Sequence, residues 1–415
     1  MTEEEFNRFE FHFGVILFRT KRFQAIMDRL GKSRISKPAG WALLYLMPVA
    51  AAIGAYIFLT EAAVLLSPRG AEVVSYIHTI SPLANIGLPG INPYLPIVDG
   101  WAALVVAMIV HEGAHGIVAR SLGLPVKSSG LLFFLVVPIG AFVDVDEDAM
   151  RGARSSYAGR VLGAGAGINL VVAIVCLLAL AATVGAFTPA ASGAGIIGVA
   201  QGSPAYNAGL RPGDIVTSVD GRNVTDLDSV LGPNTTLKAG ESINMTVFES
   251  GKLVDVNGVK LACCDVIENT QTGQNVSYPY IGVEQITGAS LTATASAYAA
   301  PLSNIYLYFC VPTLPACQTR VPYSSDLAPF YKSSLGAAAV PLANFLYWLF
   351  FLNFNLAIFN ALPIYPLDGG QAFLVGLKGL GRGRLTDRTA LTITGLVTVV
   401  VLGLVLGIVI GPYLV

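Results

Sequence analysis

The sequence predicts a polytopic α-helical membrane protein with about five to six transmembrane helices. Of its 415 residues, 54% are hydrophobic and only 12% are charged, whereas a soluble domain usually carries about 25% charged residues. A spanning helix needs about 20 mostly apolar residues. Five segments satisfy this length, at roughly 41–66, 99–121, 161–187, 341–362 and 389–411. The net charge of −1 gives no support for a nucleic-acid partner.

A sixth apolar segment, residues 130–144, is shorter than a span and is interrupted by Pro138 and Gly140. This pattern favours a β-hairpin embedded at membrane depth, which is tolerated only where protein covers it. An amphipathic cytosolic loop is the alternative. The chain begins with acidic residues, and its apolar run from Phe11 to Phe18 is too short for a span. We therefore expect no signal peptide.

The distribution of lysine and arginine predicts the orientation of the spans. Residues 1–39 hold eight basic residues, whereas residues 67–98 hold only Arg69. The connections at 120–160 and 378–388 are also basic. Because short cytosolic segments carry an excess of Lys and Arg, the N-terminus is expected in the cytosol. The polar block 188–340 and the C-terminus are then expected outside it.

Four N-x-S/T sequons agree with an extracytoplasmic block, although a chance scatter of sequons is an equal alternative. They begin at Asn223, Asn234, Asn244 and Asn275. The same block contains Cys263, Cys264, Cys310 and Cys317. An even number of cysteines in an oxidising compartment suggests two disulfides. We expect each member of the adjacent pair to bond to Cys310 or Cys317, with a four-cysteine zinc site as the alternative.

The start of this block resembles a circularly permuted PDZ domain, a β/α domain. The resemblance rests on "GAGIIG", the Ser203-Pro204-Ala205 turn, "AGL" and "RPGDIVTSVDG". We expect the domain to close near "YPYIGVEQI", so that 250–275 is an insertion. The predicted organisation is an N-terminal cytosolic segment 1–39, a transmembrane core 40–188, a PDZ-like domain 189–286, a Cys-containing connection 287–340 and a second transmembrane part 341–415.

The stretch "HEGAH" places three polar residues in an apolar span. On a helix, residues four apart share a face, so His111 and His115 can hold one zinc ion. Glu112 lies about 100° round the helix, where it can act on water rather than bind the metal. A structural histidine pair is the alternative, but these groups would then need buried partners. A catalytic zinc usually has three protein ligands, so one ligand is missing from the motif.

Asp368 is the favoured candidate for the third ligand. Glu61 lies near the outer end of the first span, and the acids at 144–148 form a run at the cytosolic edge. Asp368 follows the fourth span in "NALPIYPLDGGQAF", where Pro363 and Pro366 break the helix. Irregular backbone within a membrane is tolerated beside protein or water. Such backbone could present Asp368 to the two histidines.

Together these motifs resemble the site-2 protease family of intramembrane zinc metalloproteases. The resemblance rests on HEGAH, on a later N-x-x-P-x-x-P-L-D-G-G, and on the Gly-rich "GRVLGAGAGINLVVAIV" with its central Asn169. The order of the motifs around the PDZ-like block also matches. "GAFVD" and the Cys-Cys pair resemble the branch containing the eukaryotic sterol-regulatory protease.

The resemblance implies a residue assignment and an activity. It implies one zinc per chain held by His111, His115 and Asp368, with Glu112 as general base. Asn360 matches an asparagine proposed to hold the substrate backbone, and Asn169 is also expected near substrate. A helix-terminal cap for Asn360 and a hydrogen bond between spans for Asn169 are the alternatives.

The expected substrate is the transmembrane segment of a membrane-tethered regulatory protein, already trimmed on its outer side. Water activated by zinc would attack the peptide carbonyl, and Glu112 would carry the proton to the leaving amine. The lipid bilayer is the other expected partner. Two further function classes remain, a zinc transporter and a catalytically inactive membrane scaffold.

Overall fold

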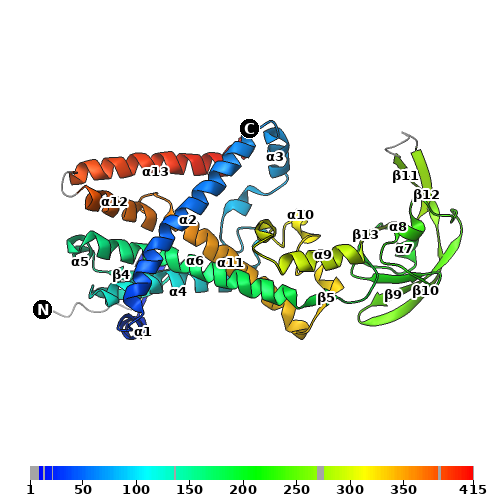
Figure 1. The fold of residues 1–415 in the computed structure, drawn as a ribbon, viewed down its shortest axis with the longest axis horizontal. Coiled ribbons are helices and arrows are strands. Elements are labelled where there is room, and N and C mark those ends of the chain that lie inside the picture. The colour runs from blue at the N-terminus through cyan, green and yellow to red at the C-terminus, as the bar shows by residue number, and fades with distance from the viewer. Residues whose placement is uncertain are drawn as a thin grey trace. The chain divides into compact units, whose positions relative to one another are not determined.

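The computed structural model describes residues 9–12, 15–20, 22–134, 137–268, 275–381 and 385–414. The chain divides into two compact units (Figure 1). The first contains Met1–Cys176 with Trp348–Val415, and the second contains Leu177–Tyr347. All of the side chains predicted for the zinc site belong to the first unit.

Five helices in the described part of the chain are long and apolar enough to cross a membrane. They are α2 (Ser36–Leu65), α4 (Ile97–Ser121), α6 (Ser155–Gly185), α11 (Ala339–Ala361) and α13 (Asp387–Ile410). This confirms the five predicted spans. The shorter helices of the first unit are α1 (Arg22–Gly31), α3 (Gly70–Ile77), η1 (Pro82–Asn85), α5 (Glu147–Gly152), α12 (Asp368–Leu380) and η5 (Gly411–Tyr413).

A four-stranded antiparallel sheet accompanies these helices, in the order β1-β2-β3-β4. Its strands are β1 (Phe9–His12), β2 (Val15–Thr20), β3 (Val126–Phe134) and β4 (Val137–Val145). The predicted hairpin corresponds to β3 and β4, which pair from Val126 with Val145 onwards. The two N-terminal strands were not predicted, although they pair with each other as a local hairpin. Their apolar run is short, and β2 also pairs with β3, which is distant in the sequence. Placement of the sheet at membrane depth stays a prediction.

The Gly-rich helix α6 packs against α2 so closely that the two backbones are nearly in contact. A Cβ atom at Gly163 would lie 2.9 Å from the Leu44 Cα, and one at Gly167 would lie 2.5 Å from the Leu43 carbonyl oxygen. Any side chain at these two positions would therefore push the helices apart. Because Gly163 and Gly167 are four residues apart, they share one face of α6. Gly165 lies between them and faces α4 instead.

The second unit contains a six-stranded sheet in the order β10-β9-β7-β6-β13, with β8 beside β7. Its strands are β6 (Ala194–Val199), β7 (Ile215–Val219), β8 (Arg222–Asn223), β9 (Ser242–Glu249), β10 (Lys252–Lys260) and β13 (Val283–Ile286). Short helices α7 (Pro204–Asn207) and α8 (Asp228–Leu231) join it. The apolar side chains Ile196, Val216 and Ile243 are fully buried in its core.

The predicted insertion at 250–275 is wrong in its first half. Strand β10 pairs with β9 in the main sheet, and its Val259 is buried in the core. Only β11 (Ala262–Glu268) and β12 (Asn275–Tyr280) form a separate hairpin. Residues 269–274 lie outside the described part of the chain. The sequence did not indicate that β10 belongs to the main sheet, because most of its side chains are exposed and face away from the core.

The remaining elements of the second unit form the connection to α11. They are β5 (Phe187–Pro189), α9 (Gly288–Tyr298), η2 (Ile305–Phe309), α10 (Pro315–Gln318), η3 (Ala328–Phe330), β14 (Tyr331–Ser333) and η4 (Gly336–Ala338). The expected disulfide pairing is wrong: Cys263 bonds to Cys264, and Cys310 bonds to Cys317. The turn into α10 brings the Cys310 and Cys317 Cα atoms to 5.5 Å, a usual separation for a disulfide.

Candidate metal centre

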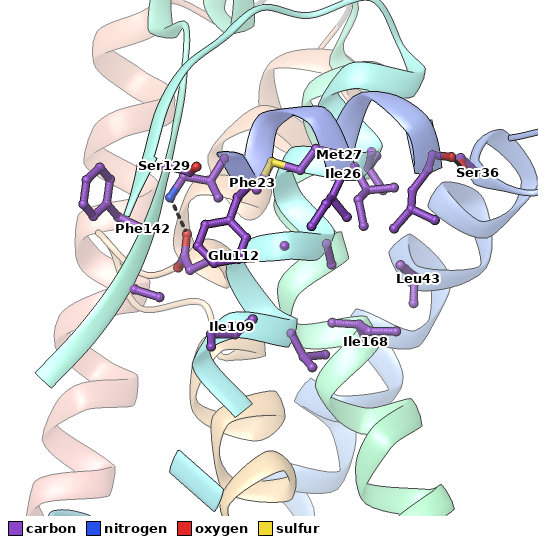
Figure 2. A pocket seen from close by; sticks show the side chains of 18 of the residues that line it. Phe23, Ile26, Met27, Ser36, Leu43, Ile109, Glu112, Ser129, Phe142 and Ile168 are labelled. Atoms are coloured by element: carbon purple, nitrogen blue, oxygen red, sulfur yellow. Dashed lines mark hydrogen bonds between the residues drawn. The ribbon is translucent and has the colours of Figure 1, made fainter. Parts of the chain in front are cut away.

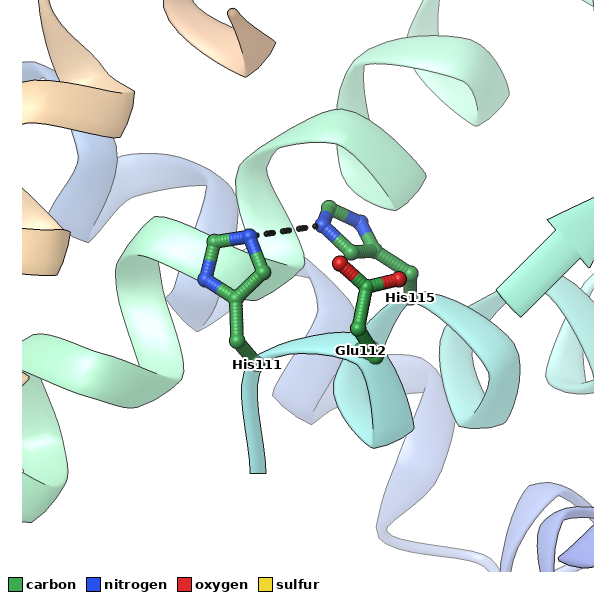
Figure 3. Close-up of side chains that lie close together, drawn as sticks. All are labelled: His111, Glu112 and His115. Atoms are coloured by element: carbon green, nitrogen blue, oxygen red, sulfur yellow. Dashed lines mark hydrogen bonds between the residues drawn. The ribbon is translucent and has the colours of Figure 1, made fainter. Parts of the chain in front are cut away.

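Three side chains that are far apart in the sequence meet in the first unit. His111 and His115 lie on α4, and Asp368 is the first residue of α12. The two histidine Nε2 atoms are 3.3 Å apart. The Asp368 Oδ2 atom lies 3.2 Å from Nε2 of His111 and 3.1 Å from Nε2 of His115. Figure 3 shows the two imidazole rings turned toward each other, with the Glu112 carboxylate beside them.

These three atoms fit the ligand set of a divalent metal ion. The Nδ1 atom of His115 lies 2.7 Å from the Val161 carbonyl oxygen. Because a carbonyl oxygen only accepts, Nδ1 carries the proton, and in the neutral ring Nε2 presents a lone pair. Asp368 Oδ2 is buried and accepts no hydrogen bond from a described residue. In a tetrahedral zinc site with bonds of about 2.0–2.1 Å, ligand atoms lie about 3.3 Å apart. A cation between them would therefore match the observed triangle.

The Gly-rich helix α6 provides the space for such an ion. A Cβ atom at Gly165 would lie 2.4 Å from His115 Nε2 and 2.5 Å from His111 Nε2. These are the two nitrogen atoms that face Asp368. Even the smallest side chain at position 165 would thus collide with the ligand atoms. Glycine leaves this position open to a metal ion.

Two glycines after Asp368 allow α12 to begin against the end of α11. A Cβ atom at Gly369 would lie 2.3 Å from the Leu362 carbonyl oxygen, and one at Gly370 would lie 2.4 Å from the Tyr365 nitrogen. Helix α11 ends at Ala361, before Pro363 and Pro366. The chain therefore turns sharply and presents Asp368 to α4. This is the irregular backbone that the prolines indicate.

Glu112 is held by the β-sheet rather than by the histidines. One of its carboxylate oxygens accepts a hydrogen bond from the Val143 N–H of β4, at 3.0 Å. Its carboxylate lies within 4.8 Å of the ligand atoms of His111 and His115. Glu112 also lines an apolar cavity of about 610 Å³ (Figure 2). The residue is thus fixed beside the metal position and accessible from a cavity.

The two predicted substrate-binding asparagines occupy different surroundings. Asn169 is fully buried, and its amide nitrogen lies 3.1 Å from His111 Nδ1. This contact joins α6 to α4, as in the alternative of a hydrogen bond between spans, and contact of Asn169 with substrate stays a prediction. Asn360 is partly buried in the last turn of α11, eight residues before Asp368.

The other acidic candidates lie away from the histidines. Glu61 is exposed on α2. Asp146 caps α5 through the Ala149 N–H and pairs with Lys127 at 3.1 Å. That hydrogen bond and the Lys127 ammonium hold the pKa of Asp146 below its ordinary value. Asp144, Asp146 and Glu147 therefore have structural partners of their own.

Sequence reasoning missed three backbone contributions to this site. The Val161 carbonyl orients His115, the Gly165 backbone leaves the ion position open, and the Val143 N–H orients Glu112. Val161, Gly165 and Asn169 recur every four residues, so they form one face of α6. That spacing was present in the sequence and could have indicated that α6 packs against the histidines.

Comparison with known proteins identifies the class. The family model described as Peptidase family M50 matches residues 100–404. The chain belongs to this family, the site-2 proteases, and is a zinc metalloprotease of the membrane. Its cofactor is zinc.

Individual relatives extend over much of the chain. An uncharacterized protein of Methanocaldococcus jannaschii is 24% identical over 86% of this chain and 75% of its own. A Nostoc protein named "Putative zinc metalloprotease" is 27% identical over 73% of this chain and 92% of its own. The zinc metalloprotease RasP of Oceanobacillus iheyensis is 26% identical over 54% of this chain and 51% of its own.

The close approach of α6 predicts that Gly165→Ala lowers zinc occupancy. The added methyl group would displace the two imidazole nitrogens, whereas Gly159→Ala on the same helix would make only an ordinary contact, 3.7 Å from Leu44 Cδ1. Metal analysis of the purified variants, with a chelator titration, measures the effect. We expect Gly159→Ala to retain zinc as the wild type does. Equal zinc affinity in both variants would contradict the assigned ion position.

Proposed function

We propose that this protease cleaves transmembrane segments of other membrane proteins at one zinc ion held by His111, His115 and Asp368. The single observation that carries the proposal is the buried triangle of ligand atoms, with sides of 3.1–3.3 Å. Two of its members lie on α4, a helix apolar enough to span a membrane. Chemistry at this position would act on peptide bonds that enter the bilayer.

Glu112 would act as the general base and then as the general acid. When bound, zinc acts as a Lewis acid that polarises the peptide carbonyl and lowers the pKa of water. The Glu112 carboxylate, oriented by the Val143 N–H, would take the proton from the attacking water. It would then deliver this proton to the leaving amine nitrogen. Asn360, at the end of α11, would hold the backbone of the substrate next to this site.

The depth of the site explains why a substrate helix must unwind. His111 lies nine residues before Arg120, at the basic end of α4, which corresponds to about 14 Å of helix. The metal position would therefore lie inside the hydrocarbon layer. A helical substrate hides its carbonyl groups in internal hydrogen bonds. Local unwinding would expose one carbonyl to the site.

We also propose a topology and a role for the second unit. The excess of basic residues in 1–39 supports a cytosolic N-terminus, and hence an extracytoplasmic position for 189–286. The strand order and the short helices α7 and α8 support a PDZ-like domain. Such a domain would exclude substrates that still carry bulky outer domains. Capture of a newly exposed substrate C-terminus, or bracing of the helices, would be its alternative roles.

Asn169 would position His111 rather than bind substrate. A His111 ring that gives Nε2 to zinc carries its proton on Nδ1. Asn169 Oδ1 has no hydrogen-bond partner among the described residues. With its amide turned by 180°, Asn169 would accept the Nδ1 proton through this oxygen. Val161 and Asn169, both on α6, would then fix the rings of both histidines.

Replacement of Glu112 by Gln should abolish proteolysis while zinc stays bound. General acid–base catalysis contributes about 10²–10⁴-fold to rate, so cleavage of a designed transmembrane substrate should fall by at least that range. Asp368→Ala should instead lose zinc, because it removes a ligand. Glu61→Gln, an exposed carboxylate on α2, is the matched control and should cleave normally. Full activity of Glu112→Gln would overturn the assignment of the base.

The Asn169 assignment predicts a change in zinc affinity. Asn169→Leu should weaken zinc binding about 10–100-fold, the usual effect of removing a partner of a metal-bound histidine. Asn169→Asp keeps an acceptor oxygen and should restore most of that affinity. Chelator competition measures both values without any substrate. If the Leu and Asp variants bound zinc equally well, Asn169 would have no role in orienting His111.

A further inference from the structure

An apolar cavity of about 610 Å³ opens beside Glu112. Figure 2 shows Phe23, Ile26 and Met27 of α1 on one side of it, with Leu43 of α2 and Ile168 of α6 further along. The described residues of the lining are apolar except for Glu112 and three serines, Ser33, Ser36 and Ser129. Its volume lies within the range of about 300–1,000 Å³ that is usual for ligand sites.

The residue after the proposed base leaves this cavity open. Gly113 lines the cavity, and a Cβ atom added there would meet no other atom within 4 Å. The situation at Gly116, one turn further along α4, is the opposite. A Cβ atom there would lie 2.4 Å from the Met27 Sδ atom of α1. Helix α4 therefore closes against α1 at position 116 and leaves open space at position 113.

The outer wall of the cavity belongs to the N-terminal part of the chain. Helix α1 is held on α4 by the contact of Met27 with Gly116 and by an ion pair of 3.0 Å between Asp28 and Arg120. The match to the peptidase family begins at residue 100. The walls supplied by α1 and α2 thus lie outside the matched region, although they face the matched base.

We infer that this cavity is a subsite for a large apolar side chain of the substrate residue beside the scissile bond, and that Gly113 sets its size. The inference rests on the proposed function. A general base must come within about 2.6–3.2 Å of the atom whose proton it takes, or reach it through one water. The scissile peptide is therefore next to Glu112, and the side chain of an adjoining residue can enter the cavity that Glu112 lines.

The lining also specifies the chemistry of that side chain. Among the described residues that line the cavity there is no basic one, and the acidic one, Glu112, is the proposed base. A charged substrate side chain would lose its hydration there without a dedicated partner. Phenylalanine, leucine or isoleucine would instead contact apolar groups from α1, α2 and α6. A lipid acyl chain is the competing occupant, which the experiment below distinguishes.

The test compares transmembrane substrates that differ only at the residues flanking a mapped cleavage site. At one flanking position the wild type should cleave the Phe form faster than the Ala form. Gly113→Leu should lower kcat/KM for the Phe form, mainly through KM, at least tenfold more than it lowers kcat/KM for the Ala form. Leu also has a higher helix propensity than Gly, so α4 should stay intact. Ala39→Leu fills the cavity from α2 and should act in the same direction.

Gly395→Leu is the matched control, since its added Cβ atom also meets no atom within 4 Å and it lies on α13. It should keep the preference of the wild type. Zinc content should be equal in all of these variants. Binding is measured separately with the inactive Glu112→Gln variant. Its substrate carries a photoreactive phenylalanine at the same flanking position. The label should attach to α1, α2 or α6, and Gly113→Leu should abolish this attachment.

Each contrary outcome has a distinct meaning. The subsite would be overturned if Gly113→Leu and Ala39→Leu both kept the wild-type preference for the Phe form. It would also be overturned if these variants retained zinc but lost cleavage of the Phe and Ala forms equally. Attachment of the photoreactive residue elsewhere would do the same and would leave the cavity to lipid. Failure of the wild type to cleave any transmembrane substrate, despite bound zinc, would overturn the proposed function itself and the subsite with it.

Discussion

The approach of α6 to the rings of His111 and His115 is the constraint on which the surrounding structure depends. Glycine at 165 lets the α6 backbone reach the ligand nitrogens, and glycines at 163 and 167 let the opposite face of α6 reach α2. The helix is therefore packed tightly on both sides. Since α4 lies on one side, its histidines are held against a rigid backbone whose Val161 carbonyl orients His115.

The remaining parts of the site are added around this helix pair. The proline-broken connection after α11 brings Asp368 to the histidines, where its carboxylate completes the triangle. The β-sheet brings the Val143 N–H to Glu112. The His115 ring and the Glu112 carboxylate thus each have a specific backbone partner, and the Asp368 carboxylate faces the ion position. Such partners are expected where burial of an unpaired polar group is unfavourable.

Much of this arrangement could be predicted from the sequence, because it depends on local patterns. The five spans follow from runs of apolar residues, and the shared face of His111 and His115 follows from helical spacing. Asp368 was selected by its proline-rich surroundings. The pairing of β2 with β3 joins distant segments and was therefore missed. The membership of β10 in the main sheet and the Cys310–Cys317 bond are local, but the exposed side chains of β10 and the cysteine spacing alone did not indicate them. The expectation for Asn169 came from a resemblance of motifs, whereas its burial against His111 is a tertiary contact that the local sequence does not show.

X-ray absorption spectroscopy of the zinc-loaded protein tests the proposed three-residue zinc site most directly. We predict a first shell of nitrogen and oxygen atoms at about 2.0–2.1 Å, without sulfur. Two imidazole rings should contribute the outer-shell scattering. In Asp368→Ala the metal should be lost or one oxygen ligand replaced. A sulfur ligand at about 2.3 Å, or a spectrum with fewer than two imidazoles, would contradict the proposed zinc centre.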